Sequence, residues 1–213
     1  AGANATTGAG NTAVGHRALV SLSTGGLNTA VGRNALASIT TGSGLTAMGP
    51  SALAANTTGT SNNGLGYQSL LNNTTGNNNV GVGNGSLSSN TIGSNNVAVG
   101  SNSTLVANTS GNNNIAFGAS ALTASICGSN IGQGYCAGCA ITTGIGNVII
   151  GSYGGSAALA CTFVVQAGNC QRLKIDGGGI CVNGTLLSTG GASLNTYCSF
   201  YVDRKSTRLN SSH

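Results

Sequence analysis

The segment TTGNNNVGVGNGSL, from Thr74 to Leu87, is one copy of a unit that is repeated through most of this chain. Related copies are TTGAGNTAVGHRAL from Thr6 and TSGNNNIAFGASAL from Thr109. In each copy a glycine closes a short apolar run, and the spacing between successive key glycines is constant except in two coils, one longer and one shorter by a single position. The key glycines are Gly15, Gly32, Gly49, Gly66, Gly83, Gly100, Gly118, Gly134 and Gly151. Nine glycines in this spacing define nine coils of a repeat protein.

Asparagine occupies a second fixed position, four residues before each key glycine. Eight of the nine coils have it, and Leu45 takes its place in the third coil. These asparagines are Asn11, Asn28, Asn62, Asn79, Asn96, Asn114, Asn130 and Asn147. If the coils stack at the strand spacing of about 4.8 Å, each asparagine amide can donate a hydrogen bond to the amide of the next coil.

The repeat predicts an all-β fold. A 17-residue coil is too short for a helical-hairpin repeat, and glycine and asparagine in every unit disfavour helix. The apolar run alternates between β-branched, small and larger residues, as in Val97, Ala98 and Val99, and a period of two indicates a strand. We therefore predict a parallel β-solenoid (β-roll or β-helix) with 17-residue coils. Each coil should have two strands of about five residues, with the glycines supplying positive φ at the corners.

The alternation also predicts which side chains point inward. We expect the β-branched and larger residues to fill the interior, together with a leucine of the second strand. These leucines are Leu19, Leu36, Leu53, Leu70, Leu87 and Leu122. The outer face would then carry only alanine and glycine, which favours close packing of another chain. The alternative is a tight coil in which the small residues only avoid crowding.

Three regions follow from the repeat and from composition. Residues 1–151 are predicted to be a β-solenoid of nine repeats, and residues 152–202 a β-rich junction or cap with strand-like runs at 161–165, 172–176 and 180–187. Residues 203–213, DRKSTRLNSSH, resemble translated adapter or vector sequence, and the alternative is an exposed polar tail. Because the chain opens inside a repeat and without Met, we expect a fragment of a longer protein.

Composition argues against several classes of function. Only 4% of residues are charged, and three of the seven basic residues lie in the tail: Arg204, Lys205 and Arg208. No basic stripe is interleaved with aromatic residues, so we expect no nucleic-acid partner. No run approaches the twenty or so apolar residues that span a bilayer, so we expect no membrane partner. With two acidic residues and two histidines, the chain offers neither a carboxylate pair nor a catalytic triad, which predicts a non-enzyme without a cofactor.

Seven cysteines lie between Cys127 and Cys198. Cys136 and Cys139 form a CxxC pair, but no second pair completes a four-ligand zinc site, so no metal is predicted. We favour the interpretation that the cysteines are small apolar fillers of the stacked coils. Disulfides within or between chains remain the alternative.

The complete TTGxxNTAVGxxAL unit, repeated over residues 1 to about 155, resembles the repeats of phage and giant-virus tail-fibre proteins. It is more distantly similar to the head repeats of trimeric autotransporter adhesins, which tend to be shorter. The resemblance implies a parallel homotrimer that acts as a fibre or stalk and supports host or surface attachment. It also implies a location in a virion tail fibre or at an extracellular cell surface. The segment QRLKIDGGGICVNGT, residues 171–185, looks like the junction that precedes a C-terminal chaperone domain in tail fibres.

Two residues that vary from coil to coil follow each key glycine, and we predict that they form exposed, surface-binding turns. The candidates for contact with a host receptor or glycan are His16, Arg17, Arg33, Asn34, Tyr67 and Gln68.

Two other functions remain open: an ice-binding solenoid and a passive extracellular matrix solenoid. The first is suggested by a column of hydroxyl residues: Thr6, Ser23, Thr40, Thr57, Thr74, Thr91, Thr109, Ser125 and Thr142. A face that matches the ice lattice needs a second threonine column, two residues after the first along the same strand. The sequence has glycine at that position, so the second column is missing.

Overall fold

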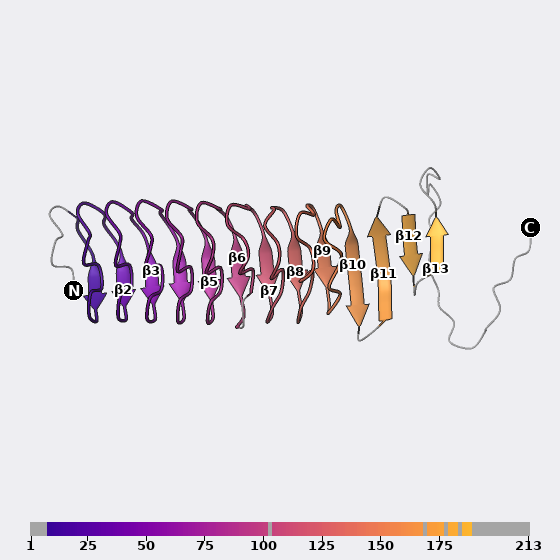
Figure 1. The fold of residues 1–213 in the computed structure, drawn as a ribbon, viewed down its shortest axis with the longest axis horizontal. Coiled ribbons are helices and arrows are strands. Elements are labelled where there is room, and N and C mark those ends of the chain that lie inside the picture. The colour runs from indigo at the N-terminus through magenta and orange to yellow at the C-terminus, as the bar shows by residue number, and fades with distance from the viewer. Residues whose placement is uncertain (1–7, 102–103, 168–169, 177–178, 183–184, 189–213) are drawn as a thin grey trace, which may run out of the picture.

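A computed structural model describes residues 8–101, 104–167, 170–176, 179–182 and 185–188, with side chains described as far as Gln166 and at Ile175. The coils stack along one axis, and each contributes one strand to a common sheet (Figure 1). Ten strands are parallel, and residues at equivalent positions lie opposite each other, such as Thr12 and Thr29. The predicted parallel β-solenoid with 17-residue coils is confirmed. Its strands are β1 (Thr12–Val14), β2 (Thr29–Val31), β3 (Thr46–Met48), β4 (Asn63–Leu65), β5 (Val80–Val82), β6 (Val97–Val99), β7 (Ile115–Phe117), β8 (Ile131–Gln133), β9 (Val148–Ile150) and β10 (Phe163–Ala167).

The prediction of two five-residue strands per coil was wrong. Strands β1 to β9 have three residues each, and the segment expected to form a second strand is a turn. Its leucines have φ between +50° and +53°, a left-handed conformation that costs a residue with a Cβ about 1–2 kcal/mol. The cost is offset because each leucine side chain is buried and its N–H bonds to the next coil, as Leu70 N does to Ser86 O at 2.9 Å. The leucines are Leu19, Leu36, Leu53, Leu70, Leu87, Leu105 and Leu122.

The predicted orientation of the strands was also wrong, because the small middle residue points inward. Ala47 and Ala116 are 0% exposed, whereas the flanking Met48 and Phe117 are 46% and 44% exposed. The coil is too narrow for large side chains at the middle position, because the turn leucine already fills it. A Cβ added to Gly81 would lie 3.2 Å from Leu70 Cγ. The prediction of an outward face of alanine and glycine was therefore wrong.

At the eighth coil the large side chain is at the inward strand position and the small residue is in the turn. Gly138 stands where the first seven coils have the turn leucine, and Ile149 stands at the inward strand position of the adjoining coil. A Cβ on Gly138 would lie 3.7 Å from Ile149 Cγ1 and 2.8 Å from Leu122 Cδ2. The large side chain thus moves from the turn to the strand while the interior stays filled, which a close-packed core requires.

The predicted asparagine column is buried except at Asn11, which is partly exposed, and its hydrogen bonds run mainly to the backbone. Asn79 Nδ2 donates to Gly93 O at 2.8 Å, and Asn79 N donates to Asn62 Oδ1 at 2.9 Å. Direct bonds between amides are present in part of the column, as from Asn96 Nδ2 to Asn79 Oδ1 at 3.2 Å. Each side chain therefore satisfies backbone groups of the next coil, which explains why asparagine is needed at a buried position.

A second buried asparagine column was not recognised in the sequence. Asn56, Asn73, Asn90 and Asn108 are 0% exposed, and successive amides bond at 2.7 to 2.8 Å. Ser125, which was assigned to the hydroxyl column, lies at the end of this column and is also buried. The assignment failed because the 16-residue coil lacks one residue after Ser125, which shifts the register. The column stops there, and Asn108 Oδ1 has no hydrogen-bond partner.

The key glycines take positive φ, as predicted, with values from +105° to +153°. The positive φ is only one reason why glycine is required here. The second reason is that successive key glycines approach each other closely. A Cβ on Gly66 would lie 2.6 Å from Gly83 O in the next coil. Any larger residue would therefore push two coils apart.

Parallel stacking continues beyond residue 151, because β10 pairs with β9. Thr162 takes the asparagine position, and its N–H donates to Asn147 Oδ1 at 3.1 Å. Three antiparallel strands follow: β11 (Cys170–Asp176), β12 (Gly179–Val182) and β13 (Thr185–Ser188). The run at 180–187, predicted as one strand, is thus divided between two strands. The predicted tail at 203–213 lies outside the described residues.

We predict that Gly66→Ala lowers the free energy of unfolding by about 3 kcal/mol, because the new methyl group meets the backbone of the next coil. Gly85→Ala is the matched control. Gly85 also has positive φ, +66°, but has open space around its Cα, so only the conformational cost of about 1 kcal/mol applies. Urea denaturation at equal protein concentration measures both. Equal losses would show that close approach of the coils is unimportant.

We predict that Ser125→Asn raises the free energy of unfolding by about 1 kcal/mol. The new amide would extend the second asparagine column and donate to Asn108 Oδ1, the buried acceptor that has no partner. Thermal denaturation of the variant and of the unaltered chain measures the difference. A lower melting temperature would mean that the shortened coil has no room for the longer side chain.

Candidate functional site

The predicted surface-binding turns lie on the outside of the coils. His16, Arg17, Arg33 and Tyr67 are exposed, and Asn34 and Gln68 are partly exposed. Arg17, Asn34 and Gln68 have φ between +55° and +60°, in the tight turn that follows the key glycine. Hydrogen bonds between coils hold these turns in line, as from Asn34 N to His16 O at 2.9 Å. The variable residues therefore form two straight columns beside the strands.

A shallow hollow of about 380 Å³ lies on this side of the solenoid. It collects residues two, five and six positions after the key glycines of the first four coils: Arg17, Asn34, Ala37, Ser38, Ser51, Ala54, Ala55, Leu71 and Asn72. Arg17 and Asn34 were predicted site residues, whereas His16, Arg33, Tyr67 and Gln68 are not in its lining. We call this hollow the arginine hollow.

The other residues of the arginine hollow were missed because the sequence argument considered only the two residues after each key glycine. Positions five and six belong to the same turn and fold back beside position two. The periodicity could have located them, because residues at these positions recur with the coil. The missing information was the path of the turn, which brings position two of one coil beside positions five and six of its neighbours.

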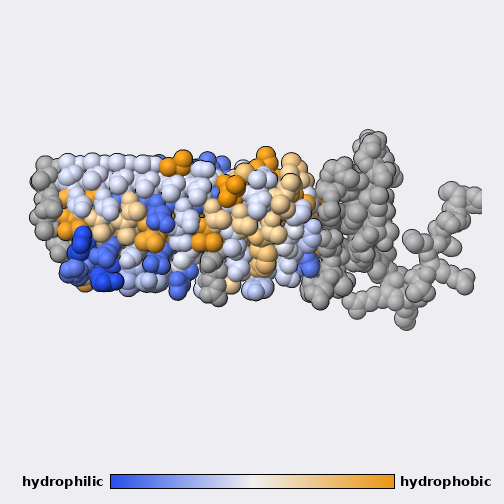
Figure 2. Space-filling model, viewed as in Figure 1, coloured by the Kyte–Doolittle hydropathy of each residue, from blue (hydrophilic) through white to orange (hydrophobic). Residues whose placement is uncertain are grey.

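The charge of the solenoid is concentrated near this hollow. Arg17 and Arg33 lie in adjacent coils, and the chain has no acidic residue before Asp176. In the view of Figure 2, the most hydrophilic patch covers the N-terminal coils. No carboxylate of the coils neutralises the two guanidinium groups, so they create an uncompensated positive potential over a nearly uncharged surface.

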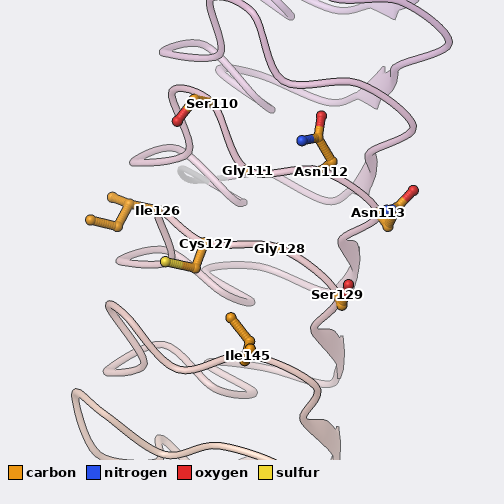
Figure 3. Close-up of a pocket in the computed structure, with 9 residues that line it drawn as sticks. All are labelled: Ser110, Gly111, Asn112, Asn113, Ile126, Cys127, Gly128, Ser129 and Ile145. Carbon is orange, nitrogen blue, oxygen red and sulfur yellow. The ribbon is translucent and has the colours of Figure 1, made fainter.

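A second hollow, of about 460 Å³, lies beside the 16-residue coil (Figure 3). It is lined by Ser110, Gly111, Asn112, Asn113, Ile126, Cys127, Gly128, Ser129 and Ile145. Ile126 and Cys127 project outward from this coil, and Ile145 lies below them on the next (Figure 3). The shortened turn accounts for the hollow, because it leaves a gap between the longer turns on either side. None of the residues in its lining is charged.

The interpretation of the cysteines as buried fillers was wrong for those whose side chains are described. Cys136 and Cys139 form a disulfide within one turn. Cys127 is partly exposed and Cys161 is exposed, and both are free thiols. The side chains of Cys170, Cys181 and Cys198 lie outside the described part of the structure. Among the described residues, no three histidine, cysteine or acidic side chains gather where they could hold a metal ion.

Most of the predicted hydroxyl column has an internal role. Thr57 Oγ1 donates to Thr74 O at 3.1 Å, and Thr74 Oγ1 donates to Thr91 O at 3.0 Å. Ser23, Thr40, Thr91 and Thr142 make the same bond to the coil that follows. These hydroxyl groups join coils and are not presented as an open row. The neighbouring exposed column contains threonines but is interrupted by Ile92 and Ile126.

No helix of the described residues is long and apolar enough to cross a membrane.

We predict that a thiol-alkylating reagent modifies Cys127 and Cys161 in the folded chain, whereas Cys136 and Cys139 react only after reduction. The first two are accessible free thiols, and the second two share a disulfide. Peptide mass mapping with and without reductant distinguishes the pairs. Labelling of Cys136 in the unreduced folded chain would contradict the disulfide.

Comparison of the chain with protein-family models, with curated proteins and with solved structures found no significant match. The function proposed below therefore rests on the geometry of the solenoid and on the resemblance of its repeat unit.

Proposed function

We propose that this chain is a structural segment of a fibre or stalk that supports attachment to a host or another surface. The observation that carries the proposal is the outward face of the parallel sheet. On this face two columns of side chains, from the first and third residues of each strand, run the length of the solenoid. We call it the outer sheet face.

The outer sheet face is largely apolar and carries no charged residue. Val14, Met48 and Phe117 are 56%, 46% and 44% exposed. The first-residue column becomes wholly apolar from β5 onward: Val80, Val97, Ile115, Ile131, Val148 and Phe163. The third-residue column is apolar in every strand except β8, where it has Gln133. A continuous apolar face of this kind marks an association surface, because covering it removes apolar area from water.

Another copy of the same chain is the partner that fits this face. Its side chains repeat at the strand spacing, about 4.8 Å, over ten strands. A partner must have the same spacing over the same length to match every row, and a parallel copy in register meets this condition. The sequence resemblance favours three copies. The result is a parallel homotrimer in which the outer sheet faces pack around a common axis.

Such an assembly suits a spacer in a virion tail fibre or at a cell surface. Ten strands at about 4.8 Å give a rod about 43 Å long. Repeats of this type contact only their neighbours, so the length of a rod is set by the number of coils. The turns remain on the outside, where they are free to differ from coil to coil.

A passive matrix solenoid would share the rod and the assembly, and only the absence of a surface-binding activity would separate it from the proposed fibre. An ice-binding solenoid is less well supported. The hydroxyl groups of this chain's column bond to the backbone of the next coil, as that of Thr57 does. The exposed threonine column beside it is interrupted by Ile92.

We predict that the full chain is a trimer by light scattering after size exclusion, and that Val82→Lys with Val99→Lys converts it to a monomer. The two lysines place charge in the centre of the outer sheet face, where desolvation is unfavourable. Asn84→Lys with Ser101→Lys is the matched control, because it adds the same charge to the same two coils at exposed turn positions. It should remain a trimer.

Circular dichroism shows whether each variant keeps its β structure. A monomeric unaltered chain, or a trimer that tolerates lysine at both strand positions, would contradict assembly through the outer sheet face.

A further inference from the structure

We propose that the arginine hollow binds an acidic carbohydrate, with Arg17 holding its carboxylate or sulfate group. The inference rests on the proposed attachment function and deepens it, because it gives the class of ligand and the place where it binds. The chemistry of the lining, its free polar groups and its position on the solenoid support it.

The lining combines the three kinds of group that a charged sugar requires. Arg17 supplies a planar guanidinium group that matches a carboxylate or sulfate with two parallel hydrogen bonds. Asn34 and Asn72 supply amides that can donate to and accept from sugar hydroxyl groups. Ala54 and Leu71 supply apolar surface against which the C–H face of a sugar ring can pack. Ligand sites of this kind combine apolar surface with a few convergent polar groups.

The polar side chains of the hollow are available to a ligand. Their backbone groups already bond between coils, as from Ser51 N to Arg33 O at 2.9 Å and from Asn72 N to Ser88 O at 3.1 Å. By contrast, no described residue hydrogen-bonds to the side chains of Asn34, Ser38, Ser51 or Asn72. The buried asparagines of the same coils, by contrast, bond to the backbone or to one another.

The positive charge is particular to these coils as well. The equivalents of Arg17 in later coils include Gln68, Gly85 and Ser120, none of which carries a charge. Arg33, one coil away and one position earlier, adds to the potential without lining the hollow. Exposed charges attract an anion over about 8 Å at physiological ionic strength. An anionic ligand is therefore drawn to the first coils, and an uncharged sugar is not.

The hollow stays accessible in the proposed assembly. All of its lining residues belong to turns after the key glycines, and none belongs to a strand. Packing of the outer sheet faces around a common axis leaves these turns on the outside. Each copy would therefore present one site, and three weak sites on one rod can bind a glycan-coated surface with higher avidity than one.

The test measures binding of three probes to the full chain by isothermal titration calorimetry. Sialyllactose carries a carboxylate, a heparin-derived oligosaccharide carries sulfates, and lactose carries no charge. We expect at least one acidic probe to bind and lactose to show no binding at up to about 10 mM. Binding of sialyllactose alone would identify the carboxylate as the recognised group, and binding of the heparin oligosaccharide alone would identify the sulfate.

Two variants locate the site. Arg17→Gln should weaken binding of the acidic probe by about tenfold or more, because it removes a charge-assisted bidentate contact. Arg33→Gln is the matched control, which removes the same charge outside the hollow and should cost about twofold. Asn34→Asp should abolish binding, because its carboxylate would pair with Arg17 and repel the probe.

Failure of the acidic probes to bind the unaltered chain would overturn the inference, and so would equal losses in Arg17→Gln and Arg33→Gln. Equal losses would mean attraction to net charge without a site. Light scattering on the same samples separates this outcome from failure of the proposed fibre, because a trimer that binds no glycan contradicts only the inference made here.

Discussion

Backbone hydrogen bonds between successive coils are the interaction on which the rest of this structure depends. They run along the strands and also along the turns, as from Leu53 N to Ser69 O at 3.0 Å. Because every coil must place the same backbone groups over the next, its path is fixed almost atom for atom. The space between two stacked coils then limits the size of the side chain at each position. This accounts for the glycines, since a Cβ on Gly66 would lie 2.6 Å from the carbonyl oxygen of Gly83.

The interior follows from the same constraint. Beside the strand a narrow coil has room for one large side chain, so in the first seven coils a turn leucine opposes an alanine or glycine of the strand. Where Gly138 replaces the leucine, Ile149 supplies the missing volume. Polar residues enter the interior where they satisfy the backbone, as the two buried asparagine columns do. Departures from the common coil length occur in the turns, and the 16-residue coil leaves a hollow beside Cys127.

The two surfaces of the coil are suited to different roles. The outer sheet face is largely apolar, uncharged and periodic, which are the properties of a surface that packs against a copy of itself. The turns vary from coil to coil, and their backbone bonds are already made, so their side chains can change without loss of the fold. The proposed fibre uses the first surface for assembly and the second for contact. In the first coils, variation has placed Arg17 beside free amides in a shallow hollow.

The sequence alone determined the period, the β class, the parallel stacking and the positions of the key glycines and of one asparagine column. It also located the exposed turns, including Arg17 and Asn34. All of these follow from recurrence at a fixed spacing. Recurrence could not show that the leucines occupy left-handed turns, because that conformation is rare for leucine and depends on contacts with the next coil. Asn56, Asn73, Asn90 and Asn108 also recur with the coil, but their spacing could not show that they are buried at a position that Leu22, Ile39 and Ile141 occupy in other coils.

The tertiary structure decided which face of each strand points inward. Alternation in the sequence shows that Val97 and Val99 share one face and that Ala98 lies on the other. It does not show which of the two faces points into the coil. The usual rule that larger apolar residues point inward fails here because Leu87 and its equivalents, from outside the strands, already fill the coil. The available volume is a property of the closed coil and not of the strand. It leaves space for alanine inside and places the valines on the outer face, where another chain can cover them.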